Sequence, residues 1–117
     1  MSKRSSPPFS KIRIAKGLAF VSGELPLLSD GSVPEGIEAQ TELVLERILH
    51  TLESMALDLS DVVSATIYLT HKEDFGLFNE VYARHFTGEL PTRATVRADL
   101  MIPDARIEIA VIAATRN

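Results

Sequence analysis

The sequence predicts an α+β fold with the element order ββαβαββ, in which a mixed sheet carries two helices on one of its faces. Two long stretches, near residues 35–56 and 74–86, repeat apolar residues at helical spacing. Shorter stretches before, between and after them show the alternating or continuously apolar pattern of strands. Because the chain has 117 residues, we expect a single hydrophobic core and one domain.

The first residues are expected to form an arm outside the fold. Pro7 and Pro8 disfavour a helix, so the sequence predicts a flexible arm over residues 1–8 and a single domain over residues 9–117. No acidic residue precedes Glu24, whereas the same segment carries these cations: Lys3, Arg4, Lys11, Arg13 and Lys16. A short basic run of this kind could bind nucleic acid, but it is more often a solvated arm.

A hairpin and a loop are expected to follow the arm. Ile12 and Ile14 alternate with polar neighbours, which is the pattern of a half-exposed strand. Gly17 provides a turn, and residues 18–22 are expected to form a second short strand. Residues 23–36 contain several prolines and glycines, so this segment is expected to be a loop.

Both helices are predicted from periodic apolar residues. The first presents one stripe toward a core, made of Val44, Ile48, Leu52 and Met55. Glu35 and Glu38 lie in its first turn, where negative charge suits the helix dipole. The second helix is predicted from about Asp74 to Phe86, and Gly88 is placed to end it. Its aromatic side consists of Phe75, Phe78, Tyr82 and Phe86.

The later strands are expected to leave one face of the sheet uncovered. Residues 62–70 should form a strand with these side chains on one face: Val63, Ala65, Ile67 and Leu69. Residues 94–100 alternate in the same way, and residues 107–114 are apolar on both faces apart from Glu108, which indicates burial on both sides. Because the helices cover only one face, we expect further subunits to cover the other.

The composition excludes several classes of function. The net charge of −4 argues against general affinity for polyanions. Without cysteine the chain has neither a disulfide nor a thiolate nucleophile or metal ligand. His50, His71 and His85 lack metal-ligand spacing, and no phosphate-binding glycine loop is visible, so we expect no metal and no other cofactor. No apolar run could span a membrane and no signal peptide is visible, so we expect a cytoplasmic protein.

Two charged residues are the candidates for chemistry. Glu108 stands alone in an otherwise apolar strand, where burying an unpaired carboxylate costs on the order of several kcal/mol. The alternative is an exposed edge at which Glu108 pairs with Arg106 or Arg97. Arg93 begins a strand, and its planar guanidinium can hold a carboxylate by two bonds, although such an arginine is more often a surface charge. Ser22 has no histidine base placed beside it, so a structural loop serine is the simpler interpretation.

A set of short motifs resembles the RidA/YjgF family. Each motif is weak alone, but the ordered set is specific and extends over residues 9 to 113. The motifs are Phe20-Val21-Ser22-Gly23, Glu38-Ala39-Gln40-Thr41, Asp61-Val62-Val63, Phe78-Asn79-Glu80-Val81-Tyr82, Pro91-Thr92-Arg93-Ala94-Thr95-Val96 and Ile107-Glu108-Ile109. The resemblance implies a chorismate-mutase-like α+β fold and a homotrimer with its sites in the clefts between subunits.

The resemblance also implies a function, the hydrolysis of reactive 2-imino or enamine acids to 2-keto acids and ammonia. The arginine that binds the substrate carboxylate in the deaminating members corresponds to Arg93, and the glutamate that helps to place the attacking water corresponds to Glu108. The further substrate-binding positions implied are Ser22, Asn79, Phe9, Glu24 and Thr95. An imine carbon is already electrophilic, so a positioned water and proton transfer suffice for its hydrolysis.

The chain departs from the usual family pattern at a few positions. Phe9 replaces a tyrosine, Glu24 replaces a glutamine, and Asp99 stands where a small or basic residue is usual. Glu24 could pair with Arg93 and compete with a substrate carboxylate, and a shifted substrate such as an aminomuconate-like enamine fits the same pattern. Two other functions stay open: an RNA-binding or endoribonuclease-type translation inhibitor, and a trimer that binds a small ligand without turnover.

Overall fold

The computed structural model describes residues 7–116 and has the predicted element order ββαβαββ. The strands are β1 (Ile12–Ala15), β2 (Leu18–Glu24), β3 (Val62–Leu69), β4 (Thr92–Arg97) and β5 (Ile107–Ala114). The helices are α1 (Ile37–Glu53) and α2 (Phe75–His85), and short 3-10 turns at Leu59–Asp61 and Lys72–Asp74 precede β3 and α2. Most of the predicted arm, residues 1–6, lies outside the described residues.

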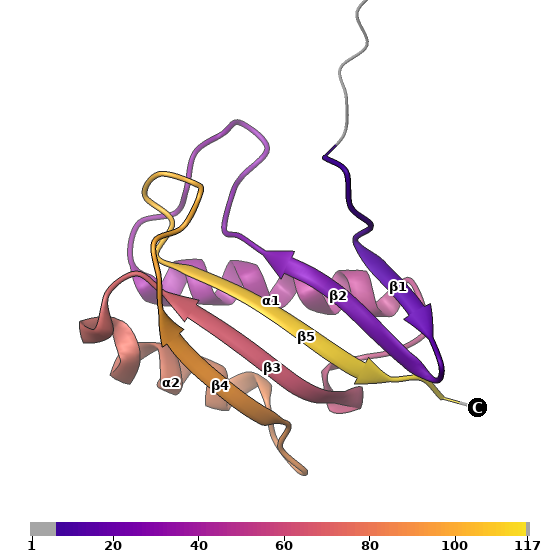
Figure 1. The fold of residues 1–117 in the computed structure, drawn as a ribbon. Coiled ribbons are helices and arrows are strands. Elements are labelled where there is room, and N and C mark those ends of the chain that lie inside the picture. Colours follow the sequence, from indigo (N-terminus) through magenta and orange to yellow (C-terminus); the bar gives the residue numbers. More distant parts are fainter. Residues whose placement is uncertain (1–6, 117) are drawn as a thin grey trace, which may run out of the picture.

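The strands form one mixed sheet in the order β1-β2-β5-β3-β4 (Figure 1). All neighbours are antiparallel except β3 and β4, which are parallel. A parallel pair needs a crossover connection, and α2 supplies it. This topology places β4 at one edge of the sheet and β5 near its centre, so the two strands that carry Arg93 and Glu108 are separated by β3.

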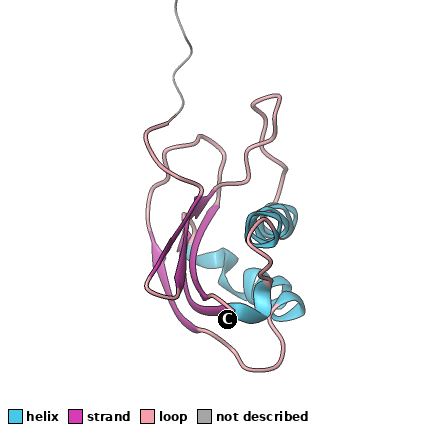
Figure 2. Ribbon diagram, turned by 90° about the vertical axis from the view of Figure 1, so that its right-hand side faces the viewer, coloured by secondary structure: helices cyan, strands magenta, loops and turns pink. Residues whose placement is uncertain are grey.

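Both helices pack on the same face of the sheet, as Figure 2 shows. The fully buried side chains come from α1, α2 and the helix-facing positions of the central strands; the largest are Phe78, Leu45, Ile48, Leu52, Ile67, Ile107 and Ile109. Val44, Ile48 and Leu52 are buried as the helical spacing predicts. Helix α1 ends at Glu53, and Ala56 has a φ of 58°, so Met55 lies outside the core. The opposite face of the sheet is covered by no element of the described chain.

The strand predictions are wrong in detail at three places. Between Val62 and Ser64 the register shifts, so that Val62 rather than Val63 faces the core, and Val63 is 45% exposed. Strand β4 ends at Arg97 rather than at Leu100, because its neighbour β3 ends at Leu69 and offers no further partner. Strand β2 continues to Glu24 through a second irregularity, into the segment predicted to be a loop.

Within residues 7–116, no helix has the length and hydropathy that crossing a membrane requires.

Candidate functional site

Arg93 lies on β4 with its side chain on the helix side of the sheet. It is in register with Ala65 of β3, which is buried under the helices. Its Cζ atom lies 5.7 Å, 5.2 Å and 4.9 Å from the ring centroids of Phe75, Phe78 and Tyr82. These cation–π contacts orient the guanidinium. No ion pair among the described residues involves Arg93, so the guanidinium is available to bind an anion.

Two hydroxyl groups near Arg93 are buried without a hydrogen-bond partner in the described chain: Tyr82 Oη and Thr95 Oγ1. Burial raises the pKa of Tyr82, although the charge of Arg93 opposes this shift. Thr95 follows Arg93 by two positions on β4, so both side chains point to the same face. Buried polar atoms usually have partners, so these hydroxyls favour a polar ligand or water here. Asn79 lies on α2, half-buried.

Glu108 lies on β5 with its side chain on the open face of the sheet. It is in register with Tyr68 of β3, while its neighbours Ile107 and Ile109 are buried on the helix side. The alternative interpretation, an exposed edge at which Glu108 pairs with Arg106 or Arg97, is wrong. Strand β5 lies between β2 and β3, Arg106 pairs with Asp74 at 2.7 Å instead, and Arg97 is in no ion pair among the described residues. Burial raises the pKa of Glu108, which has no ion-pair partner among residues 7–116.

The Glu108 carboxyl group lies against the backbone of Gly23, in the space that a side chain at this position would occupy. A Cβ atom on Gly23 would lie 2.1 Å from Glu108 Oε2, a distance that no side chain tolerates without moving. Gly23, Tyr68 and Glu108 line a cleft of about 400 Å³, together with Ala98, Asp99, Leu100, Met101 and Ala110. The sequence motif includes Gly23 but does not reveal this contact, because it depends on the pairing of β2 with β5.

Ser22 and Phe9 lie in a neighbouring cleft of about 260 Å³ at the end of β2. The Ser22 hydroxyl donates a hydrogen bond of 2.5 Å to the carbonyl of Ser10. This bond fixes the segment that precedes β1 against β2. Ser22 therefore has the structural role that its sequence context suggests, and it also lines the cleft.

Glu24 borders the same cleft and is paired with cations that the sequence analysis did not connect to it. Its carboxylate lies 3.4 Å from Lys11 Nζ and 4.0 Å from Arg47 Nη1. Arg47 also donates a hydrogen bond to the carbonyl of Leu27. The suggested ion pair between Glu24 and Arg93 does not occur within the chain. Lys11 and Arg47 were not recognisable as partners because Lys11 lies just before β1 and Arg47 lies in α1, both distant from Glu24 in the sequence.

The predicted site residues thus form two separate groups. Arg93, Thr95 and Asn79 belong to the edge formed by α2 and β4, with Arg93 on the helix side. Glu108 projects from the opposite face of the sheet. Phe9, Ser22 and Glu24 line a second cleft. Gly23 lines both this cleft and the cleft of Glu108, so the two clefts are neighbours. The second group therefore consists of Phe9, Ser22, Gly23, Glu24 and Glu108. One chain does not bring Arg93 and Glu108 to a common ligand.

Comparison with known proteins agrees with this geometry. A family model described as endoribonuclease L-PSP matches residues 2–115. A structure of YyfA from Yersinia pestis, of the Rid protein family, is 32% identical, covers 95% of this chain and 90% of that chain, and has a TM-score of 0.88. The chain belongs to the RidA/YjgF family. The family membership explains the order of the motifs and the observed topology.

Other members of the RidA/YjgF family are similar over nearly the whole chain. Protein DfrA of Myxococcus xanthus is 39% identical over 112 residues, which are 91% of this chain and 84% of that protein. A structure of E. coli TdcF with bound serine has a TM-score of 0.86 at 26% identity, covering 96% of this chain and 91% of that chain. In the part of this chain that the structure describes, no group of three or more His, Asp or Glu side chains is arranged to hold a metal ion.

Proposed function

We propose that the protein hydrolyses 2-imino or enamine acids to 2-keto acids and ammonia, in a site completed between two subunits of a homotrimer. The observation that carries this proposal is the separation of Arg93 and Glu108 on opposite faces of one sheet. Arg93 supplies a cation that can bind the substrate carboxylate, and Glu108 supplies a carboxyl group that can transfer protons. A second copy of the chain can supply the half of the site that one copy lacks.

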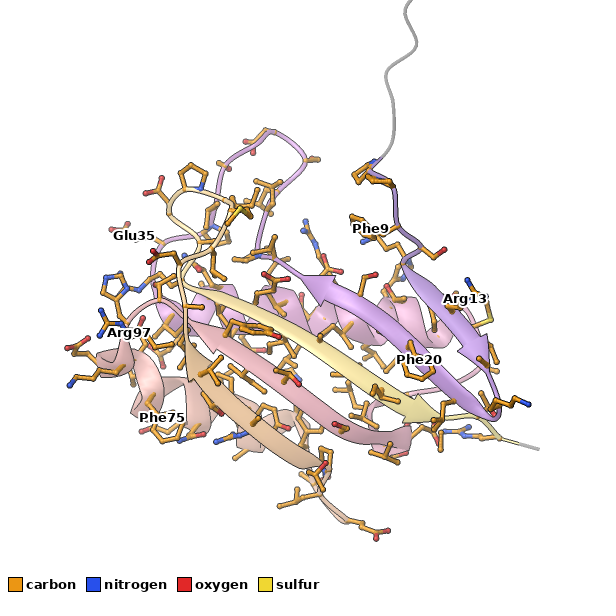
Figure 3. All side chains as sticks on the ribbon, in the orientation of Figure 1. Phe9, Arg13, Phe20, Glu35, Phe75 and Arg97 are labelled. Atoms are coloured by element: carbon orange, nitrogen blue, oxygen red, sulfur yellow. The ribbon has the colours of Figure 1, made fainter. Side chains whose placement is uncertain are left out.

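The open face of the sheet supports the assembly. Its exposed apolar side chains include Phe20, which is 43% exposed, and Val96, which is 45% exposed. Phe20 is in register with Ile112 of β5, so apolar groups continue across the sheet on this face. Figure 3 shows Phe20 on the face turned away from the helices. Continuous apolar patches of this kind usually mark an interface between proteins, and here the partner is another copy.

Arg93 is suited to bind the carboxylate of the substrate. A guanidinium that is oriented by aromatic rings loses little conformational entropy when it grips a carboxylate with two hydrogen bonds. The neighbouring hydroxyls of Tyr82 and Thr95 lack partners in the described chain and can bond to the substrate or to a water beside it. The relative TdcF, whose structure holds serine, binds a molecule with the same amino-acid carboxylate.

Glu108 is suited to exchange protons during hydrolysis. Water adds to the imine carbon, and its proton passes to the nitrogen through the carboxyl group. The resulting amino alcohol then breaks its C–N bond as its hydroxyl proton passes to the leaving nitrogen, which releases ammonia and leaves the 2-keto acid. Because burial raises the pKa of Glu108, its carboxylate accepts a proton from the attacking water more readily than that of an ordinary glutamate.

The remaining predicted residues shape the space around these two groups. Phe9 and Ser22 border the cleft next to Gly23, and Glu24 is neutralised by Lys11 and Arg47. A carboxylate that is already paired competes less with the substrate for Arg93. Asn79 is half-buried on the helix that carries the aromatic rings, where its amide can bond to a polar ligand.

Mixed trimers test the shared site directly. Arg93→Ala and Glu108→Gln chains, each inactive alone, are expressed together with different affinity tags, and trimers carrying both tags are isolated. Each trimer that contains both variants has one intact site of three, so the isolated mixed trimers should regain roughly a third of the wild-type rate, and an unsorted random mixture roughly a quarter. Imino acids are generated in the assay by an amino acid oxidase, and ammonia release or loss of the imine is followed.

The outcomes separate the parts of the proposal. Recovery in mixed trimers supports a site made from two subunits. Folded variants that stay inactive together would contradict the shared site, and a stable monomer at micromolar concentration in light scattering would contradict the trimer. If neither the wild type nor any mixture hydrolyses an imine, the protein is a ligand-binding trimer or acts on another substrate.

RNA cleavage is the second candidate function. It is favoured by the family description, endoribonuclease L-PSP, and by cations along the α2–β4 edge that have no acidic partner in the described chain. The net charge of −4 opposes it, and contacts to phosphate should weaken steeply as salt rises. Tight, salt-resistant binding and cleavage of an oligoribonucleotide by a protein lacking residues 1–6 would favour this function over imine hydrolysis.

A further inference from the structure

A cleft continues from Arg93 along the helix side of β4. It has a volume of about 260 Å³ and is lined by Leu69, Lys72, Phe75, Thr95, Val96 and Arg97. Phe75 connects it to Arg93, because the Phe75 ring also lies under the guanidinium. Arg93, Thr95 and Arg97 occupy alternate positions of β4, so their side chains leave the strand on the same side. The cleft therefore extends from the cation at Arg93 toward a second cationic end.

The two cations at the far end have no acidic partner in the part of the chain that the structure describes. Lys72 and Arg97 are in no ion pair. The two acids that follow Lys72 in the sequence, Glu73 and Asp74, interact with Arg106 instead. Asp74 pairs with Arg106 at 2.7 Å. The hydrogen bond and the charge of Asp74, together with the charge of Glu73, raise the pKa of Arg106. In a chain of net charge −4, unpaired cations that gather at one cleft require an explanation.

The distribution of unpaired cations shows that this clustering is specific. The other described lysines and arginines outside ion pairs are Arg13 and Lys16, in the first hairpin. In Figure 3, Arg13 lies at the opposite side of the sheet from Arg97, which is close to Phe75. The remaining described cations are matched by acids, so the unmatched positive charge of residues 7–116 lies near the two edges of the sheet, and at the β4 edge it lines a cleft.

We propose that the substrate is a 2-imino or enamine acid with a second carboxylate at the end of its side chain, held by Arg97 and Lys72. This inference rests on the proposed function. Arg93 receives the carboxylate next to the imine, the apolar walls at Leu69 and Phe75 accept the methylene groups, and the second carboxylate reaches Arg97 and Lys72. Arg93 and Arg97 are four residues apart on β4, about 13 Å along the strand, and the length and flexibility of arginine side chains allow both to reach one ligand.

The test compares substrates that differ only in the second charge. L-glutamate and L-glutamine are converted by amino acid oxidases to imino acids of nearly equal shape, and kcat/KM is measured for each. The wild type should prefer the glutamate-derived imine by about tenfold or more. Arg97→Gln should bring the ratio of the two kcat/KM values close to one, and Arg97→Lys should retain part of it.

Arg13→Gln is the matched control, because Arg13 is also exposed and outside any described ion pair but lies on β1. It should leave the substrate ratio as in the wild type. A wild-type ratio near one would overturn the inference. So would an Arg97→Gln ratio equal to that of the wild type, or an equal loss of preference in Arg13→Gln, which would indicate a general charge effect.

A binding measurement keeps this inference separate from the proposed function. The affinities of 2-oxoglutarate and of its neutral amide, 2-oxoglutaramate, are compared by calorimetry. The imine derived from leucine has no second carboxylate. If it is hydrolysed, but neither the kcat/KM ratio of the glutamate- and glutamine-derived imines nor the affinity ratio of 2-oxoglutarate and 2-oxoglutaramate exceeds one, only the second-carboxylate site is wrong. If no imine is hydrolysed, but 2-oxoglutarate binds more tightly than 2-oxoglutaramate and Arg97→Gln removes this difference, the proposed reaction is wrong and the dicarboxylate site stands.

Discussion

The α2–β4 edge and the open face at β5 are opposite in charge and in surroundings. At the edge, the Arg93 guanidinium lies over three aromatic rings without a carboxylate. On the open face, Glu108 lies beside Gly23 and Tyr68 without a cation. Some other charges are paired within the chain, as Arg106 is with Asp74. Each region thus holds one unpaired charge of opposite sign, and a second copy of the chain would bring the two together in the proposed site.

Removing the cation from the edge should have the largest effect. Arg93→Ala is expected to lower kcat/KM for imine hydrolysis at least about a hundredfold, because losing a charge-assisted bidentate contact costs roughly 2–5 kcal/mol. Arg93→Lys should recover little, since a lysine keeps the charge but loses the two-pronged geometry. Arg84→Ala, which breaks an exposed pair with Glu42, is the control and should change turnover little. Near-normal turnover in folded Arg93→Ala trimers would contradict the carboxylate-binding role.

Crowding the carboxyl group on the open face should have the next largest effect. Gly23→Ala places a Cβ atom 2.1 Å from Glu108 Oε2, so the carboxyl group must move. Misplacement of this size lowers turnover on the order of tenfold to a hundredfold, whereas the flexible end of the side chain limits the loss of stability. Gly76→Ala, at a helical position with nothing within 4 Å, is the matched control. Equal turnover in both variants would mean that the position of Glu108 is unimportant.

The missing cation beside Glu108 can be tested through stability. A raised pKa means that ionisation destabilises the folded protein, so the wild type loses stability as pH rises from the unfolded pKa, about 4, through the folded one. Glu108→Gln cannot ionise. Its melting temperature should therefore exceed that of the wild type at pH 7, and the difference should vanish near pH 3. A variant less stable than the wild type at pH 7 would show that a cation of another subunit reaches Glu108.

The smallest effect is expected at Glu24. Glu24→Gln removes the charge that Lys11 and Arg47 neutralise, and Lys11 is largely exposed, so the loss of stability should be below about 1 kcal/mol. Because the pair lies away from Arg93 in the chain, turnover should stay within about twofold of the wild type. A marked rise in turnover would instead indicate that Glu24 of one subunit closes on Arg93 of another.

The fold was predictable because its signals are local. The spacing of Val44, Ile48 and Leu52 determines the face of α1 that packs on the sheet, and the nearly continuous apolar run of residues 107–114 indicates the strand β5. The shift between Val62 and Ser64 was not predictable, since both valines are equally apolar and only the pairing with β5 decides which is buried.

The candidate site residues could be named from the sequence, but their geometry could not be predicted from it. Motif order identifies Arg93 and Glu108, yet which face each side chain occupies depends on the register of β3 with β4 and β5. The aromatic spacing of Phe75, Phe78 and Tyr82 was visible in the sequence as one side of a helix. That it lies under Arg93 follows only from the parallel crossover that brings α2 against β4.

The position of β4 at the edge of the sheet has a further consequence for solubility. An edge strand presents unpaired backbone groups that can recruit strands from other molecules and start aggregation. Both edge strands of this sheet carry exposed arginines, Arg13 on β1 and Arg93 and Arg97 on β4, and none is neutralised by an acid of the described chain. Charge repulsion between such edges opposes uncontrolled strand addition. The arginines that we propose to bind an anionic substrate would thereby also oppose growth of the sheet into a fibre.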